Sequence, residues 1–251
     1  MDDYFLFYVS PEHIQGGRIL FPGEEARHLV QVLRKRPDDV VRVTDGAGRR
    51  MKVRLIQADK KQVTGEIMST EEVPSGPELI LAMGMIRRRD RLEFAIEKAV
   101  ELGASRIVLV RSDHAENVSL KPGRIDRIII SAMKQSLHCR LPAWEERGSF
   151  HDVLAAYGDN RKVFLAHPEG VDMEYSTNKE RGDETGPGFN SVMPGASPTG
   201  CLLMVGPEGG FSEVEMEQAV TSGAQLIRLG TKRLRTETAV CALMVLVSCS
   251  K

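Results

Sequence analysis

The chain changes its hydrophobic pattern near residue 73. Before that point, apolar residues occur in short alternating or β-branched runs, each of which predicts a strand. These runs are Tyr4 to Val9, Ile19 to Phe21, Val40 to Thr44, Met51 to Leu55 and Val63 to Ile67. The stretch from Glu24 to Leu33 has helical spacing instead. Several short strands with one helix predict a small β-barrel over residues 1–73, and barrels of this size often bind RNA.

From residue 74 onward, strand and helix patterns alternate, after a Pro- and Gly-containing stretch typical of a linker at Pro74 to Pro77. The apolar runs that predict strands are Leu79 to Met83, Ile107 to Val110, Val163 to Ala166, Leu202 to Val205 and Leu226 to Leu229. The helical patterns are Asp90 to Leu102, which ends at Gly103, and Arg124 to Ser136. This alternation predicts an α/β domain with a mostly parallel sheet over residues 74–251.

One segment departs from this alternation. Residues 170–200 are rich in Gly, Ser, Thr, Pro and charged residues and have almost no apolar periodicity. Such a composition predicts a long, poorly ordered loop inside the α/β domain.

Two segments near the C-terminal end carry the candidate chemistry. Val205 to Ser212 and Leu229 to Ala239 each begin where an apolar run ends, and a helix-like stretch follows each of them. Strand-to-helix junctions of this kind can converge at one edge of a parallel sheet, where α/β proteins usually bind ligands. The glycines of the first segment allow the backbone to approach a flat ligand closely. The two segments therefore predict a cofactor pocket.

Other glycine-rich sites fit the sequence less well. The glycines are not followed by Gly-Lys-Ser/Thr, so a P-loop would lack its lysine and its metal-binding hydroxyl. No Gly-x-Gly-x-x-Gly follows a first strand, as a dinucleotide site requires. A plain tight turn remains the alternative for Gly206 to Gly210. Ser212 and Glu215 form a capping-box pattern, which predicts that a helix starts directly after the glycines and directs free N–H groups toward the loop.

Composition narrows the class of protein. The four cysteines show no Cys-x-x-Cys pair, which argues against zinc and a disulfide scaffold and favours a reducing compartment. The start of the chain does not resemble a signal peptide, and the apolar run from Ala239 to Val247 is too short to span a bilayer. We therefore expect a cytoplasmic protein with no metal and no membrane partner.

The charge is distributed unevenly along the chain. The net charge is −1, but residues 84–140 contain twelve Lys or Arg residues and seven Asp or Glu residues. A basic region joined to a near-neutral cofactor region is typical of an enzyme that holds a polyanion. For any single basic cluster, a solvated surface is the alternative explanation.

Together, these motifs resemble the RsmE family of bacterial methyltransferases. The resemblance rests on Gly206 to Ser212, on Leu229-Gly230 and on Arg233 to Ala239. Further matches upstream are His28-Leu29, Val32 to Arg34, Arg91 with Glu97 to Gly103, and Ala132 to Ser136 ahead of Leu141-Pro142. They extend over most of the chain, from about residue 5 to residue 247.

This resemblance implies a specific fold and reaction. Family members use S-adenosylmethionine to methylate N3 of a uridine in 16S ribosomal RNA of the small subunit, and they act as homodimers. They combine an N-terminal PUA-like barrel with a C-terminal SPOUT domain that contains a trefoil knot. The resemblance places the cofactor at Ala166, His167, Gly206, Pro207, Glu208, Gly209, Gly210, Leu229, Gly230, Leu234, Thr236, Thr238 and Ala239.

Physical roles for individual residues follow from this chemistry. Methylation at N3 requires loss of the imide proton of uracil, so the site needs a base or a field that lowers the pKa of the nucleobase. Arg235 is the candidate that stabilises negative charge on the uracil oxygens, and Glu208 is the candidate base. An ion pair of Arg235 with Glu237 or Glu208 is the structural alternative. Residues expected to contact RNA are His28, Arg34, Arg88, Arg89, Arg91 and Gln135.

Two other functions remain open from the sequence. One is a SPOUT methyltransferase that acts on another RNA, such as transfer RNA. The other is an RNA-binding protein or ribosome-assembly factor that has the fold but no catalytic activity. The segment Arg235 to Ala239 argues against the second alternative.

Overall fold

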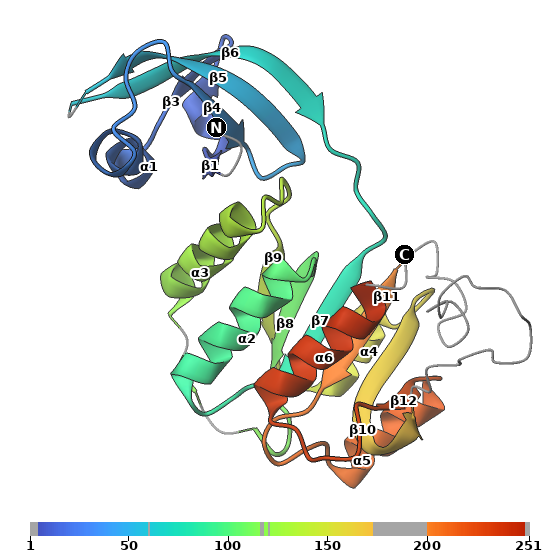
Figure 1. The fold of residues 1–251 in the computed structure, drawn as a ribbon. Coiled ribbons are helices and arrows are strands. Elements are labelled where there is room, and N and C mark those ends of the chain that lie inside the picture. Colours follow the sequence, from blue (N-terminus) through green and yellow to red (C-terminus); the bar gives the residue numbers. More distant parts are fainter. Residues whose placement is uncertain (1–4, 60, 116–117, 120, 173–199, 249–251) are drawn as a thin grey trace, which may run out of the picture. The chain divides into compact units, whose positions relative to one another are not determined.

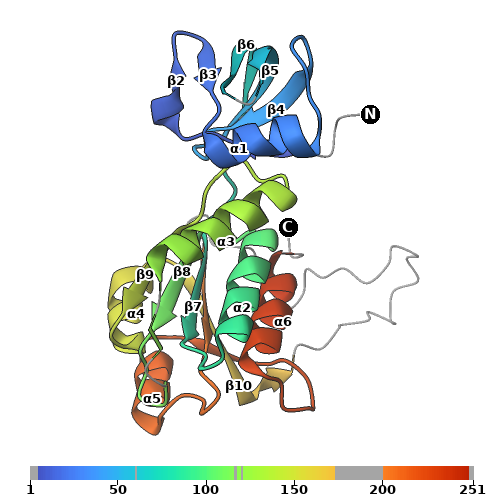
Figure 2. The ribbon, with the colours of Figure 1, turned by 90° about the vertical axis from the view of Figure 1, so that its left-hand side faces the viewer.

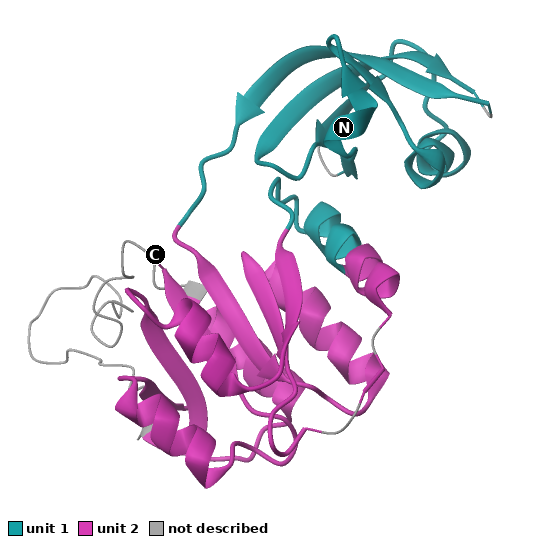
Figure 3. Cartoon of the chain, turned by 180° about the vertical axis from the view of Figure 1, so that it is seen from behind, with its two compact units in different colours: residues 1–76, 129–141 teal, residues 77–128, 142–251 magenta. Residues whose placement is uncertain are grey.

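The computed structural model describes residues 5–59, 61–115, 118–119, 121–172 and 200–248 (Figure 1). The chain contains two compact units (Figure 3). The first unit contains residues 1–76 and 129–141, and the second contains residues 77–128 and 142–251. Residues 129–141, which include most of the predicted second helix, thus group with the N-terminal unit.

The first unit is built on a six-stranded sheet with the order β1-β4-β5-β6-β3-β2. Strands β1 and β4 pair in parallel, and the other neighbours pair antiparallel. The strands are β1 (Leu6–Tyr8), β2 (Ile14–Gln15), β3 (Arg18–Leu20), β4 (Val40–Thr44), β5 (Arg49–Ala58) and β6 (Val63–Glu72). The predicted helix forms as α1 (Gly23–Arg27), which continues as a π-helical turn over His28–Val32, and a short 3-10 helix covers Pro11–His13.

The core of this unit follows from the alternation seen in the sequence. Inward-facing residues of the central strands, such as Met51, Val53 and Leu55 of β5, are almost fully buried. They pack with Phe7, Phe21 and other apolar side chains into one cluster. Because strand residues alternate between two faces, the intervening side chains of β5 remain exposed.

The segment 129–141 is held within the first unit by polar contacts. Lys134 forms an ion pair with Glu25 of α1, and Thr44 Oγ1 donates a hydrogen bond to the Cys139 carbonyl at 3.0 Å. The Arg140 guanidinium donates to the carbonyls of Ala47 and Val73 at 2.8 and 3.0 Å. These bonds anchor the turn after β4 and the end of the barrel segment to residues 139–141.

The second unit contains a six-stranded sheet with the order β12-β10-β11-β7-β8-β9, in which all neighbouring strands are parallel. The strands are β7 (Leu79–Gly84), β8 (Arg106–Val110), β9 (Ala143–Arg147), β10 (Lys162–Asp172), β11 (Cys201–Val205) and β12 (Gln225–Arg228). The mixed α/β fold with a parallel sheet that the sequence predicts is confirmed.

Helices cover both faces of this sheet (Figure 2). These helices are α2 (Arg89–Glu101), α4 (Phe150–Tyr157), α5 (Glu213–Thr221) and α6 (Thr236–Ser248). Helix α3 (Pro122–Gln135) begins in this unit, and its residues from 129 onward belong to the first unit. Phe150 and Leu154 of α4 and Ala219 of α5 pack with side chains from one face of the strands. Helices α2 and α6 contact each other and lie on the opposite face. Leu92, Ala95, Ile96 and Ala99 of α2 are buried, and Gly103 follows the helix at φ +90°.

The predicted loop at 170–200 falls mostly outside the described residues. Residues 170–172 belong to strand β10, and residue 200 precedes β11. No helix among the described residues is long and apolar enough to cross a membrane.

Candidate functional site

Both segments singled out in the sequence begin at the same edge of the parallel sheet. Because all neighbouring strands are parallel, the carboxyl ends of β7, β8, β10, β11 and β12 lie along one edge. The first segment follows β11 and the second follows β12, and β10 lies between these two strands. This edge is the usual position of a ligand site in an open α/β sheet.

The first segment forms a tight turn. The N–H of Gly210 donates to the carbonyl of Pro207 at 2.9 Å, and Gly210 has φ +77°. Pro207 is buried against the end of β7, where a Cβ added to Gly84 would overlap it. A Cβ added to Gly209 would lie 2.8 Å from the Cβ of His114. Packing within the protein therefore already requires glycine at positions 84 and 209.

The capping box predicted after the glycines is present. Ser212 Oγ accepts a hydrogen bond from the N–H of Glu215 at 3.2 Å, and Glu215 Oε2 accepts one from the N–H of Ser212 at 2.9 Å. Both residues also contact Asp113, in the loop after β8: Ser212 Oγ donates to Asp113 Oδ2 at 2.7 Å, and Glu215 Oε1 accepts from the Asp113 N–H at 3.3 Å. The start of α5 is thereby connected to the loop after β8.

The second segment continues from β12 through an open turn into α6. Gly230 has φ +127°, and a Cβ added there would meet no atom within 4 Å. Helix α6 begins at Thr236, which is buried, and its first turn is closed by a 2.8 Å bond from the Ala239 N–H to the Arg235 carbonyl. Arg233 Nη2 donates to the Glu208 carbonyl at 3.3 Å. This bond joins the two segments directly.

Strand β10 is irregular around Ala166 and His167, where the resemblance also places the cofactor. Ala166 and Val171 both pair with Ile227 of β12, so residues 167–170 bulge out of the ladder. Within this bulge, His167 Nδ1 accepts a hydrogen bond from the Glu169 N–H at 3.2 Å. Ala166 thus lies beside β12 near the start of the second segment, whereas His167 belongs to the bulge.

A hollow of about 510 Å³ lies between the start of α2 and the start of α6. Its lining residues are Arg88, Asp90, Arg91, Phe94, Arg235, Glu237 and Thr238. Arg88 is held by Asp90 through a two-pronged contact of 3.1 and 2.8 Å, which lowers the pKa of the Asp90 carboxyl. Arg91 Nε lies 3.5 Å from Glu237 Oε1, so the ion pair at this site connects α2 to α6.

Arg235 is exposed at the rim of this hollow. The structural alternative for this residue was an ion pair with Glu237 or Glu208. Within the described ranges, Glu237 pairs with Arg91, and Arg235 forms no ion pair. The guanidinium of Arg235 is therefore available to a ligand in the hollow.

The residues predicted to contact RNA fall into two groups. His28, Arg34 and Gln135 belong to the first unit, where the His28 ring contacts the rings of Phe5 and Phe7, and Arg34 and Gln135 are exposed. Arg88, Arg89 and Arg91 stand together at the start of α2 in the second unit. Arg91 differs from its two neighbours because it is mostly buried in its ion pair with Glu237.

Sequence reasoning did not assign Asp113, His114 or Phe94 to the site. Asp113 and His114 approach it only because β8 lies two strands from β11 in the sheet, an order that no local pattern reveals. Phe94 follows Arg91 by three positions on α2, so helical spacing could have placed it beside the arginine run. No group of His, Cys, Asp or Glu side chains suited to a metal ion occurs in the part of the chain that the structure describes.

Comparison with known proteins identifies the family of the chain. Residues 73–248 match a family model described as an RNA methyltransferase domain, and residues 21–68 match one described as an RNA methyltransferase PUA domain. The ribosomal RNA small subunit methyltransferase E of Bacillus subtilis is 26% identical over 248 residues, which cover 95% of this chain and 93% of that protein.

Solved structures show the same relationship. The ribosomal RNA small subunit methyltransferase E of Neisseria gonorrhoeae, bound to S-adenosyl methionine, has a TM-score of 0.77 and 29% identity, with 96% of this chain and 95% of the other covered. A probable rRNA-methyltransferase from Porphyromonas gingivalis has a TM-score of 0.79 and 31% identity, with 98% of this chain and 100% of the other covered. The chain therefore belongs to the RNA methyltransferase family, as its resemblance to RsmE proteins predicted.

Proposed function

We propose that this protein transfers a methyl group from S-adenosylmethionine to N3 of a uridine in 16S ribosomal RNA, in the cytoplasm. The observation that carries the proposal is the joining of the two segments by Arg233 and Glu208, beside a hollow that contains Arg235. The relatives named small subunit methyltransferase E support the choice of substrate. The Neisseria structure supports the choice of cofactor.

The backbone of the two segments suits a cofactor of this size. Gly210 and Gly230 have positive φ, and an added Cβ at either position would point into open space. The residues that would hold the cofactor are Ala166, His167, Gly206, Pro207, Glu208, Gly209, Gly210, Leu229, Gly230, Leu234, Thr236, Thr238 and Ala239. When bound, S-adenosylmethionine supplies an electrophilic methyl group on a sulfonium centre.

The remaining chemistry belongs to the side chains of the hollow. The N3 lone pair of uracil becomes nucleophilic once the imide proton leaves, and the resulting negative charge spreads over the two carbonyl oxygens of the base. Arg235 carries donors that can contact such oxygens, and no carboxylate among the described residues pairs with it. Glu208, exposed in the neighbouring turn, is our candidate for the base that accepts the imide proton.

We also propose that the second unit is a SPOUT domain with a trefoil knot and that the active form is a homodimer. The support for a dimer is an exposed apolar side chain on each of the helices α2 and α6. Phe94 and Val245 are 44% and 41% exposed on these two adjoining helices. Light scattering should give a mass near twice 27.8 kDa.

Labelled cofactor provides the test of the reaction. Purified protein is incubated with methyl-labelled S-adenosylmethionine and unmethylated small ribosomal subunits, and the labelled nucleoside is identified after digestion. Label in 3-methyluridine is the expected result. Label in another nucleoside, or only in added transfer RNA, would assign the protein to a different substrate. Absence of cofactor binding in calorimetry would favour the non-catalytic alternative.

Arg235→Ala then tests the assigned role within this reaction. We expect its single-turnover rate to fall about 10²–10³-fold, as when one donor to a developing negative charge is removed. Cofactor affinity should stay within about twofold. Lys232→Ala is the matched control, because Lys232 is an exposed cation in the same segment. Equal rates for the two variants would show that Arg235 is not a catalytic residue.

A further inference from the structure

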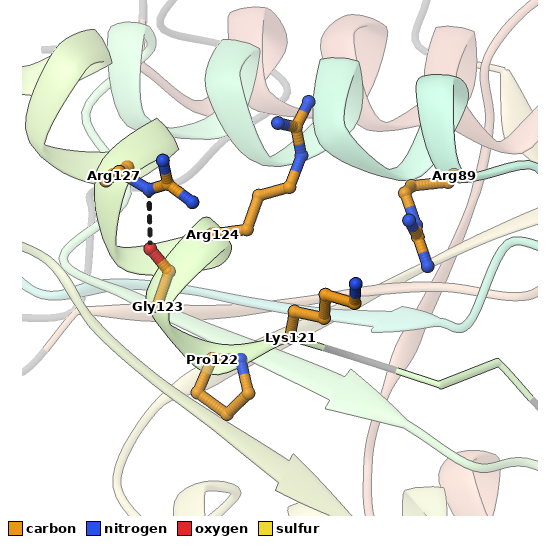
Figure 4. Close-up of a pocket in the computed structure, with 6 residues that line it drawn as sticks. All are labelled: Arg89, Lys121, Pro122, Gly123, Arg124 and Arg127. Atoms are coloured by element: carbon orange, nitrogen blue, oxygen red, sulfur yellow. Dashed lines mark hydrogen bonds between the residues drawn. The ribbon is translucent and has the colours of Figure 1, made fainter.

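A second cavity, of about 680 Å³, lies between α2 and the start of α3 (Figure 4). Its lining residues are Arg89, Lys121, Pro122, Gly123, Arg124 and Arg127. Four of these six residues carry a positive charge, and all four are exposed. Lys121, Arg124 and Arg127 follow one another at intervals of three residues, which places them along one side of the helix start.

Two of the four cations, Arg124 and Arg127, have side-chain contacts within the protein, and the other two form no ion pair with a described carboxylate. Arg124 forms a two-pronged ion pair with Glu93 of α2, and Arg127 Nε donates to the Gly123 carbonyl at 3.0 Å. Among the residues that the structure describes, no carboxylate forms an ion pair with Lys121 or Arg89. Figure 4 shows Arg89 and Lys121 extending toward each other from α2 and from the residue before α3.

This arrangement opposes the helix dipole. The N-terminal end of a helix carries partial positive charge and free N–H groups, so it favours acidic residues and disfavours cations. Helix α3 has no acidic residue in its first turn, and Lys121 and Arg124 lie at its start. Glu93 compensates the charge of Arg124, but no carboxylate among the described residues pairs with Lys121, and an anion bound in the cavity would compensate for that charge.

The cavity adjoins the hollow that contains Arg235. Arg89 lines the cavity, whereas Arg88 and Arg91 line the hollow, so the first turn of α2 separates the two. A helix is about 10–12 Å across with its side chains. A ligand long enough to cross one helical turn can therefore occupy both.

We propose that this cavity binds phosphodiester groups of the substrate RNA while the target nucleotide occupies the hollow beside Arg235. The identity of that RNA rests on the proposed function. The lining includes no aromatic ring and no amide side chain, so it offers contacts to phosphate and none that read a base. The cavity thus holds the strand in register without contributing to sequence choice.

The double variant Lys121→Ala/Arg127→Ala tests the proposal in the full-length protein. Its affinity for a 16S ribosomal RNA transcript should fall roughly fivefold at about 0.1 M salt, the effect of two modest charge contacts. The slope of log affinity against log salt should become shallower by about 1.4, since each phosphate contact on a single strand contributes about 0.7. In turnover assays, KM for RNA should rise while kcat and cofactor affinity stay unchanged.

Arg106→Ala/Arg161→Ala is the matched control. It removes the same charge at the amino ends of β8 and β10, the edge opposite the cavity. We expect the wild-type salt slope for this control. Thermal unfolding supplies a further readout, because removal of cations from the α3 start should leave Tm unchanged or raise it, whereas loss of a structural contact would lower it.

The outcomes separate this proposal from the proposed function. Wild-type RNA affinity and salt slope in the Lys121→Ala/Arg127→Ala variant would overturn the phosphate site even if 3-methyluridine forms normally. If no methylation is found, the affinity for polyuridylic acid and its salt slope still test the phosphate site, because phosphate contacts do not depend on sequence. Binding of inorganic phosphate that this variant abolishes, with unchanged RNA affinity, would assign the cavity to a small anion and also overturn the proposal.

Discussion

Arg91 was predicted to contact RNA, but the structure gives it an internal partner whose loss should be measurable. Its Nε lies 3.5 Å from Glu237 Oε1, and the two side chains are only 24% and 11% exposed. The second oxygen of Glu237 has no hydrogen-bond partner among the described residues. Removal of Arg91 would therefore leave a buried carboxylate without its ion-pair partner, in the first turn of the helix that follows the second segment.

The magnitude follows from the separation and the burial. At 3.5 Å and an effective dielectric constant near 20, the attraction between unit charges is about 5 kcal/mol, and the cost of burying both groups offsets much of it. We expect Arg91→Ala to lower the free energy of unfolding by about 2–3 kcal/mol. Glu237→Gln introduced into Arg91→Ala should restore part of that loss, with a coupling energy of about 1–2 kcal/mol.

Urea unfolding of the wild type, the two single variants and the double variant gives this coupling energy. Arg88→Ala is the control, because both Arg88 and its partner Asp90 are exposed and solvent screens their attraction. Strictly additive effects of Arg91→Ala and Glu237→Gln would refute the reasoning. RNA affinity measured on the same four proteins would then show whether Arg91 acts through direct contact.

Two further predictions concern the turns that shape each unit. Gly84→Ala should force Pro207 away from the end of β7, lower Tm by about 4–8 °C and weaken cofactor binding, whereas Gly123→Ala, which meets no neighbour, should do neither; calorimetry of both variants checks this. Burial would raise the pKa of Asp45, but hydrogen bonds that include one from Arg49 outweigh it and hold that pKa below its usual value. Asp45 therefore stabilises the fold above the ordinary aspartate pKa of about 3.9, and this contribution is lost as pH falls through the lower folded-state value. Asp45→Asn should lower the free energy of unfolding by about 1–2 kcal/mol at pH 7, and its difference from wild type should shrink in acid. Urea unfolding that gives the same difference at pH 7 and in acid would contradict this.

The sequence predicted the elements that local patterns specify. The parallel-sheet domain, the helix predicted from Asp90 to Leu102 and the capping box at Ser212 all depend on spacing within a few residues. All three are present, and the helix is observed at Arg89–Glu101. Strand β9 was missed because its Glu145, Glu146 and Arg147 give an edge strand the appearance of a polar loop. Helix α4 was missed although Ser149 caps it and accepts a bond from the Asp152 N–H at 3.1 Å.

What the sequence could not provide is the order of strands in the sheet. The contact of Gly209 with His114 and the bond between Arg233 and Glu208 join residues about 95 and 25 positions apart. The cation cavity likewise requires α2 and α3 to lie side by side, which residue spacing does not reveal. The residues of the candidate site could thus be predicted from local patterns, whereas the residues that they contact depend on the order of the strands.

The shared carboxylate of Glu215 has a thermodynamic consequence. One of its oxygens caps the helix that follows the glycine turn, and the other accepts a bond from Asp113, in the segment that leads toward Lys121. A ligand that immobilises either segment reduces the entropy that remains to be lost by the other. A ligand bound at the glycine turn should then raise the affinity of the segment after β8 for its own ligand. Because linkage is reciprocal, the second ligand must raise the affinity for the first by the same factor.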